Sequence, residues 1–343
     1  MDKLKSYILS NFSLLFFSIF LPLFSIASVV FIIKLATMTA IIRLTLAEML
    51  KLYIFVLPDL LFYTLPITFF IAATMSLHKL SSDNEMTVVF ALGIEPFQIL
   101  KILLVPALIL SATLIFIVLI LFPHAKILST NFIQYKTSEA KFNLGASEFG
   151  HSFGDWMLYI GDNDKHGNYS DVFLFHKSDH EEILIGAKEA EVISEKGVMK
   201  LKLHSGEGYS YTDHSLSQMN FESMIINDMM NIKLNKYENP IDFWIAKNDS
   251  ERIQKRKHRR LAMYTILSLF PLLSLFTIMG IGIVNARHQQ GHLYLSIFLT
   301  VLVYYGAAFT LNKPLEFYAV PLVVIVWLAT TYYLYRTKVV ARF

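Results

Sequence analysis

Long stretches of the chain carry no charged side chain, and their length limits the fold more than any other feature. A helix rises 1.5 Å per residue and needs about 20 apolar residues to cross the hydrocarbon core of a bilayer. Five runs meet this condition: Phe12–Ile33, Ile102–Phe122, Leu261–Ala286, Leu293–Asn312 and Phe317–Tyr335. A sixth, Leu52–Leu77, contains Pro58, Asp59 and Pro66 but is otherwise apolar. We therefore predict an α-helical membrane protein with six transmembrane helices.

The distribution of charge divides these spans three and three. Only 17% of the residues are charged, against about a quarter in an ordinary soluble domain. Charges are dense from His124 to Arg260 and sparse on either side. We predict spans one to three in residues 1–123, a soluble insert in 124–247, and spans four to six in 248–343. The net charge of +3 is small and spread out, which gives no reason to expect a nucleic acid partner.

The insert has the pattern of an all-β domain. Short runs with strand character alternate with clusters of glycine, asparagine and aspartate; three examples are Trp156–Ile160, Val172–Phe175 and Glu182–Ile185. The run Val198–Leu203 alternates with period two, so one face should be buried and the other wet. We expect a small antiparallel sandwich or barrel. A helix is expected from Pro240 to Arg260, with Asp249 or Ser250 as its cap.

Basic residues in the short loops set the orientation of the spans. The segments on the side of the termini hold Lys3, Lys5, Lys79, Lys101, Arg287, Arg336, Lys338 and Arg342. The short loops on the opposite side hold Lys34, Arg43, Lys51 and Lys313. This favours cytoplasmic termini and an external insert. The basic run 252–260 would then lie outside against the rule, although long translocated domains largely escape it.

The motifs of common catalytic sites are absent from the sequence. There is no phosphate-binding loop, no HExxH, no GxSxG elbow and no glycine-rich dinucleotide fingerprint. The chain has no cysteine, which excludes a cysteine nucleophile and a thiolate metal site. We interpret Asp179–Glu182 as a solvated loop rather than a metal site, and Gly280 and Gly282 as small residues that permit close helix packing. We expect no catalytic residue, no metal and no cofactor.

Asp59 is the one acid well inside a predicted span, and such acids are functional candidates because their burial is costly. It lies seven residues from the end of its apolar run, about 10 Å deep at 1.5 Å per residue. A snorkelling or capping role beside Pro58 and a role in a proton relay both remain open. No second buried acid is present to complete a relay.

The loop between spans two and three predicts a short helix, about residues 82–93, at the cytoplasmic surface. Ser82 and Glu85 have the spacing of a capping box. Gly93 can end the helix in the left-handed conformation, and Pro96 can open the next helix. The carboxylate of Glu85 is either this capping acid or a charged contact to a partner protein.

The apolar side chains of this short helix need a partner. Met86, Val89 and Phe90 are expected to point outward, where they would meet lipid headgroups, the protein's own spans or another protein. On the opposite side of the membrane, Lys34, Arg43 and Lys313 flank the ends of spans one and five. They are either interfacial snorkels or contacts to the phosphates of an acidic amphiphile.

Several segments resemble the LptF/LptG permeases, the membrane part of the lipopolysaccharide-export ABC transporter. They are Ser82–Val89 with Ala91–Gly93, Pro58–Asp59 with Pro66, and Val284–Gly291. The resemblance covers the whole chain in order. The last segment departs from a VNPRxG-type pattern, because Ala286 replaces the proline and Gly291 lies further on. This variant leans towards LptF.

The resemblance implies a non-catalytic permease subunit in the bacterial inner membrane, paired with a homologous second permease and a cytoplasmic ABC ATPase dimer that hydrolyses ATP. Spans one and five would admit lipopolysaccharide. A periplasmic jellyroll-like domain would pass it to a bridge of similar proteins. The short helix would be the coupling helix that binds the ATPase, through Glu85, Met86, Val89, Phe90, Leu92 and Gly93. Lys34, Arg43 and Lys313 would contact substrate phosphates.

Two other classes of function remain open at this stage. An intramembrane enzyme acting on lipid-linked glycans would need convergent acids or a metal, and only Asp59 is available. A membrane sensor with an external ligand-binding β domain would need neither six spans nor a coupling-type loop.

Overall fold

The computed structural model describes residues 2–39, 44–141, 151–153, 156–163, 168–178, 181–195, 198–212, 215–228, 239–245, 250–284 and 292–341. The chain forms two compact units. The helical unit comprises Met1–Ala36, Leu46–Ser129 and Lys236–Phe343, and the second unit comprises Thr37–Thr45 and Thr130–Asn235. The domain boundaries drawn from the sequence at 123 and 247 stay predictions.

Within the ranges just given, five helical segments are long and apolar enough to cross a membrane, which agrees with the predicted α-helical membrane protein. Three belong to the first half of the chain: α1 (Asp2–Thr39), α2 (Leu46–Ser82), and α4 (Pro96–Phe116) continued by the π-helix η1 (Ile117–Leu121) and α5 (Phe122–Lys141). Two belong to the second half: α10 (Leu293–Leu315), and the 3₁₀ turn η2 (Glu316–Tyr318) with α11 (Ala319–Tyr335) and the π-helix η3 (Arg336–Val340).

The remaining predicted span falls on a kinked helix in three pieces. These are α7 (Glu251–Ser268), α8 (Phe270–Leu273) and α9 (Leu275–Gly282). Pro271 has no N–H to continue the helical ladder, yet the Leu273 N–H bonds the Leu269 carbonyl at 2.9 Å and the Ile278 N–H bonds the Ser274 carbonyl at 2.8 Å. The pieces therefore follow one another as one interrupted helix. That it crosses the membrane, which gives the count of three plus three, stays a prediction.

The core of the helical unit is built around α2. Its phenylalanines Phe62, Phe69 and Phe70 are fully buried, and the helix packs against α9 and α4. Helices α2 and α9 approach closely at Gly282, where a Cβ atom would lie 2.8 Å from the Leu77 Cβ. A Cβ on Gly280 would meet nothing within 4 Å. The packing interpretation therefore holds for Gly282 but not for Gly280.

Much of α1 stays outside this core. Ile8 and Phe12 in its first half are buried, and the Phe12 and Phe69 rings lie 5.3 Å apart. Its second half is largely exposed, as is α10. The exposed apolar side chains of that half include Ile26, Val29, Val30, Ile32 and Ile33. Such a surface suits lipid or another membrane-spanning helix.

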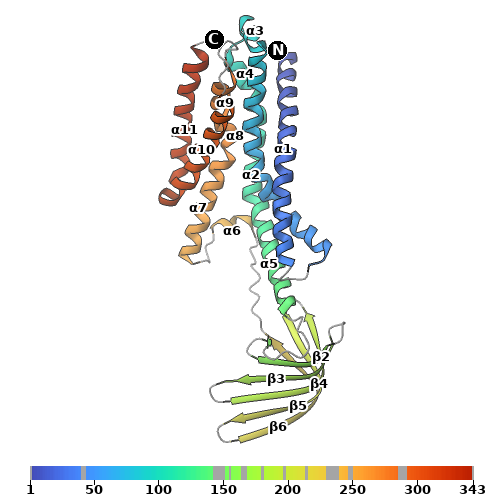
Figure 1. Cartoon of the computed structure of the whole chain (residues 1–343). Helices are drawn as coiled ribbons and strands as arrows, with labels where there is room; N and C mark the ends of the chain where they lie inside the picture. Colours follow the sequence, from blue (N-terminus) through green and yellow to red (C-terminus); the bar gives the residue numbers. More distant parts are fainter. Residues whose placement is uncertain are drawn as a thin grey trace. The chain divides into compact units, whose positions relative to one another are not determined.

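Both ends of the chain lie at the same end of the helical unit (Figure 1). The short helix α3 (Glu85–Ala91) lies at this end too. Because α1 begins there and runs for 38 residues, Lys34 lies near the opposite end. This arrangement agrees with the expectation that the termini and the loop after span two share one side of the membrane.

The second unit contains an antiparallel sheet of six strands in sequential order. The strands are β1 (His151–Phe153), β2 (Trp156–Asn163), β3 (Asn168–Lys177), β4 (Glu181–Glu195), β5 (Val198–Thr212) and β6 (Ser215–Asp228). Each predicted strand run lies in one of them, and Leu201 and Leu203 are buried as the alternation predicts. The inserted β domain is thus confirmed. Its described strands form one up-and-down sheet, and the second sheet of a sandwich is not among them.

The chain returns from the insert through two helices instead of the one predicted. These are α6 (Pro240–Ile245) and α7, with residues 246–249 outside the described part of the chain. Ser250 is the N-cap residue of α7, but its side chain makes no capping hydrogen bond. Asp249, the alternative cap, lies outside the described residues.

Candidate functional site

The short helix α3 begins differently from the prediction. Helix α2 continues through Ser82, so this residue is not the N-cap. The N-cap is Asn84, with φ of 62°, and its side chain makes no capping bond. The left-handed backbone at Asn84 turns the chain from α2 into α3, and asparagine tolerates this conformation better than most residues. The predicted capping box is therefore wrong.

The end of α3 follows the prediction. Gly93 has φ of +81°, the left-handed region that glycine adopts at least cost. The Gly93 N–H bonds the Phe90 carbonyl at 3.0 Å, and the Ile94 N–H bonds the Val89 carbonyl at 3.4 Å. These two bonds form a Schellman motif. Pro96 then opens α4, so the helix is stopped and the next one started as the sequence indicates.

The apolar side chains of α3 divide between two faces, and the predicted outward face is wrong. Met86 is only 2% exposed and belongs to the core of the helical unit, and Val89 and Phe90 pack against that core. By contrast, Val88 is 58% and Leu92 75% exposed. In a helix of seven residues the sequence pattern is too short to identify the buried face. We call Thr87, Val88, Ala91 and Leu92, which are all exposed, the α3 outer face.

Glu85 connects α3 to the first helix. The Tyr7 hydroxyl of α1 approaches both carboxylate oxygens of Glu85, at 2.8 and 3.0 Å, and donates its hydrogen bond there. Nothing in the sequence points to this contact, because 78 residues separate the partners. Glu85 is therefore not a capping acid, and its carboxylate already accepts a hydrogen bond within the chain. It ties the short helix to α1.

Asp59 lies inside α2 near the end opposite to α3. Because α2 runs unbroken from Leu46 to Ser82, Asp59 does not cap a helix. Its carboxylate is partly buried and interacts with the positive charge of Lys126 on α5. A snorkelling role for Asp59 and a role in a proton relay both stay predictions.

The structure does not bring the three predicted phosphate-binding residues, Lys34, Arg43 and Lys313, together in one described site. Lys34 lies on α1 and Lys313 on α10, and both side chains are exposed. Arg43 lies outside the described residues. A phosphate site shared by these residues therefore stays a prediction.

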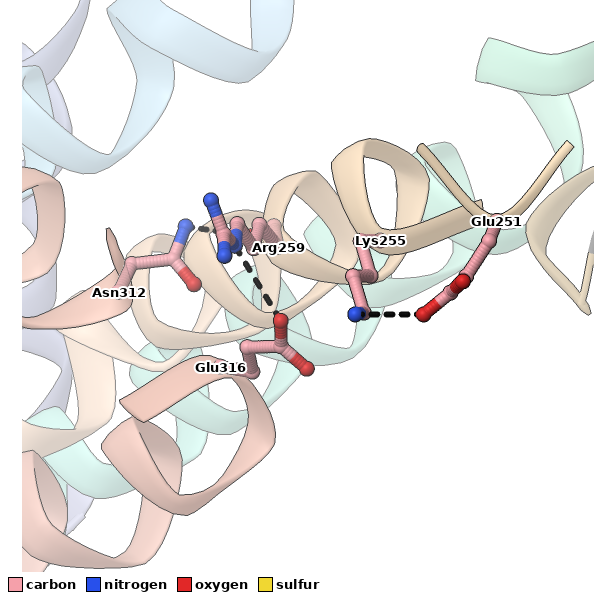
Figure 2. Close-up of polar contacts among 5 residues, drawn as sticks. All are labelled: Glu251, Lys255, Arg259, Asn312 and Glu316. Atoms are coloured by element: carbon pink, nitrogen blue, oxygen red, sulfur yellow. Dashed lines mark hydrogen bonds and ion pairs between the residues drawn. The ribbon is translucent and has the colours of Figure 1, made fainter. Parts of the chain in front are cut away.

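A row of polar contacts joins α7 to the connection between α10 and α11 (Figure 2). The Arg259 Nε lies 3.3 Å from the Glu316 carboxylate, and the Asn312 amide donates to the Arg259 carbonyl. Glu316 has φ of 50°, so these contacts hold a strained backbone where α10 ends. One turn earlier, the Lys255 ammonium lies 2.7 Å from Glu251 and lowers the pKa of that carboxyl below its usual range.

The helix α6 is fixed to the third span by a buried tryptophan. The Trp244 Nε1–H donates to the Val118 carbonyl at 3.2 Å. This carbonyl lies in the π-helix η1, where the Phe122 N–H bonds Ile117 instead, and Pro123 has no N–H to offer. Trp244 therefore satisfies a backbone acceptor that the helix leaves open, and its ring stacks on Phe122 at 5.9 Å.

The acidic and histidine cluster at 179–182 is partly described. Glu181 accepts a hydrogen bond from Ser210 at 2.6 Å, and Glu182 pairs with Lys177 at 2.6 Å. Within the described ranges, no group of three or more histidine, aspartate or glutamate side chains is placed to hold a metal ion. The two described acids thus have partners within the sheet.

Comparison with known proteins agrees with this architecture. No curated protein matches the chain. The family model described as "Lipopolysaccharide export system permease LptF/LptG" matches residues 6–335. The match includes the helices before the insert, the insert itself and the helices after it. The chain therefore belongs to the LptF/LptG family of lipopolysaccharide export permeases.

Proposed function

We propose that the chain is the permease subunit of an ATP-driven exporter that takes lipopolysaccharide from the inner membrane and passes it to a periplasmic bridge. ATP is hydrolysed by a separate cytoplasmic ATPase dimer, and a homologous second permease completes the membrane part. The family match over residues 6–335 carries this proposal. The exposed apolar side chains of α1 and α10 support pairing with a second permease.

The α3 outer face supplies the contact to the ATPase in this proposal. Leu92 and Val88 expose apolar surface at the end of the helical unit where both termini lie. Apolar side chains on a short surface helix cost free energy in water and fit a groove in a partner. The left-handed turn at Gly93 ends α3 at a defined residue, so the backbone fixes the direction in which the α3 outer face points.

Co-purification of an ATPase tests this proposal. We expect Val88→Glu with Leu92→Glu to lose the ATPase, because two charges would then enter an apolar contact. Leu216→Glu is the matched control, since Leu216 is an equally exposed leucine on β6. If the wild-type chain, expressed in its own host, brings down no ATPase, the proposal fails.

The cargo is tested separately in liposomes. We expect lipopolysaccharide to stimulate ATP hydrolysis by the assembled complex, and Lys34→Glu to reduce that stimulation by repelling the phosphates. Stimulation that Lys34→Glu leaves unchanged would remove Lys34 from the substrate path. Hydrolysis that does not respond to the glycolipid would contradict the proposed cargo.

A further inference from the structure

Three arginines share one exposed face of α7. Arg252, Arg256 and Arg260 are each exposed and follow one another at intervals of four residues. With 3.6 residues per turn they fall within an arc of about 80°, and the row is about 12 Å long. In the predicted orientation these arginines would lie on the external side of the membrane, where the positive-inside rule expects few basic residues.

The other cations of α7 are already engaged within the protein. Arg259 pairs with Glu316 and Lys255 with Glu251. Lys257 lies 4.7 Å from the Phe243 ring centre. Across the described part of the chain, no carboxylate forms an ion pair with the three arginines of the row. The charge of Arg260 also acts on Tyr63 and Tyr264 inside the helical unit, so Arg252 and Arg256 are the two of the row whose charge is most open to a partner outside the chain.

Apolar side chains are exposed beside this row. Ile253 directly follows Arg252 on α7. Ile241 and Ile245 lie one turn apart on α6, which packs against α7, and Ile241 is 67% exposed. The buried Trp244 fixes α6 to the third span through its hydrogen bond to the Val118 carbonyl, and the isoleucines of α6 stay exposed. The apolar part of α7 begins with Leu261, directly after the last arginine. Because α7 runs unbroken from Glu251 into this apolar part, the row stands where the helix would leave the hydrocarbon core, and exposed cations and isoleucines at this level suit a membrane interface.

We propose that α6 together with residues 250–260, here called the basic elbow, stands at the membrane surface, where α7 leaves the hydrocarbon core, and binds the phosphates of anionic phospholipids. The isoleucines enter the acyl boundary, and the guanidinium groups donate paired hydrogen bonds to phosphate oxygens. The partner is the bilayer rather than the exported glycolipid. The row is exposed and about 12 Å long, so several headgroups of the surrounding bilayer can reach it at once.

A single fluorescent label tests this surface. The chain has no cysteine, so Ser250→Cys introduces one labelling site beside the row. The full-length labelled protein is placed in vesicles of phosphatidylcholine, with or without phosphatidylglycerol, that carry a quencher on the lipid headgroup. We expect stronger quenching with phosphatidylglycerol, and loss of this difference when salt rises from about 0.1 M to about 1 M, where the Debye length falls from about 10 Å to about 3 Å.

Two triple variants separate charge from folding. Changing Arg252, Arg256 and Arg260 to glutamine should abolish the response to phosphatidylglycerol, because each basic residue at an anionic surface strengthens association about fivefold. Changing the same three to lysine should preserve it. Equal quenching in both kinds of wild-type vesicle would overturn the proposal, as would an unchanged response in the glutamine variant. A response to added lipopolysaccharide but not to phosphatidylglycerol would assign the row to the cargo instead.

Discussion

At the scale of single residues, Glu85 accepts a hydrogen bond from Tyr7 within the chain and is also a candidate contact to the proposed ATPase. Tyr7→Phe removes only the hydrogen bond to α1, whereas Glu85→Lys also reverses the charge on α3. We expect Tyr7→Phe to retain the ATPase in a co-purification assay and Glu85→Lys to lose it. If Tyr7→Phe loses as much ATPase as Glu85→Lys does, Glu85 acts by holding α1 and not by touching the partner.

Trp244 offers a second test at this scale. Trp244→Phe keeps an aromatic ring but removes the donor to the Val118 carbonyl, which leaves a buried acceptor unpaired at a cost of about 1–3 kcal/mol. We expect a lower midpoint of thermal unfolding in detergent. Trp327→Phe is the matched control, because the buried Trp327 Nε1 has no hydrogen-bond partner in the described part of the chain. Equal losses in the two variants would mean that ring volume, not the hydrogen bond, is responsible.

At the scale of elements, two glycines of α9 should respond in opposite directions to the same change. Gly282→Ala would place a Cβ 2.8 Å from Leu77 and 3.0 Å from the Thr74 carbonyl, and such overpacking costs about 1–3 kcal/mol. Gly280→Ala meets open space and should stabilise the helix by about 0.5–1 kcal/mol. Thermal unfolding of both variants in detergent measures the difference. A Gly282→Ala variant as stable as the wild type would contradict the close α2–α9 packing.

Local signals in the sequence are enough to predict several of these elements. Gly93 and Pro96 mark the end of α3 and the start of α4 because their backbone restrictions act within a few residues. Pro271 could have predicted the kink in the span after the insert by the same physics. The buried side of α3 could not be predicted, since Met86 is buried by distant helices. The contacts Tyr7–Glu85 and Trp244–Val118 join residues far apart in sequence, and no local pattern encodes them.

At the scale of the whole molecule, the fixed thickness of a bilayer allows membrane-spanning helices to be predicted from the length of apolar runs. The insert was predictable from its density of charge, and its strands from the alternation of apolar and polar residues. The contacts between side chains of different helices could not be predicted. An apolar run indicates that a helix lies in the membrane, but it does not show which face of the helix packs against its neighbours. The phosphate contacts show this limit. Lys34 and Lys313 lie on α1 and α10 as the predicted spans require, but the sequence does not indicate whether the two side chains face one site.

The orientation of the whole molecule gives a further prediction. Because the chain lacks cysteine, Asn84→Cys beside α3 and Leu216→Cys on β6 each introduce one thiol at an exposed position. A membrane-impermeant thiol reagent added to cells with a permeabilised outer membrane should label Leu216→Cys and spare Asn84→Cys until the inner membrane is opened. The reverse pattern would place the termini outside.

The unequal burial of α1 along its length has a mechanical consequence. Its first half is anchored by Ile8 and Phe12, while the apolar residues from Ile26 to Ile33 mostly face away from the protein. Two contacts nonetheless join this half to α2, because the Ser28 hydroxyl lies 2.9 Å from the Tyr53 hydroxyl and the Phe31 and Tyr53 rings lie 6.3 Å apart. The Tyr7–Glu85 hydrogen bond joins α3 to the anchored half, so we expect a movement of α3 to be passed to α1 at its buried end first and to the lipid-facing residues only after it.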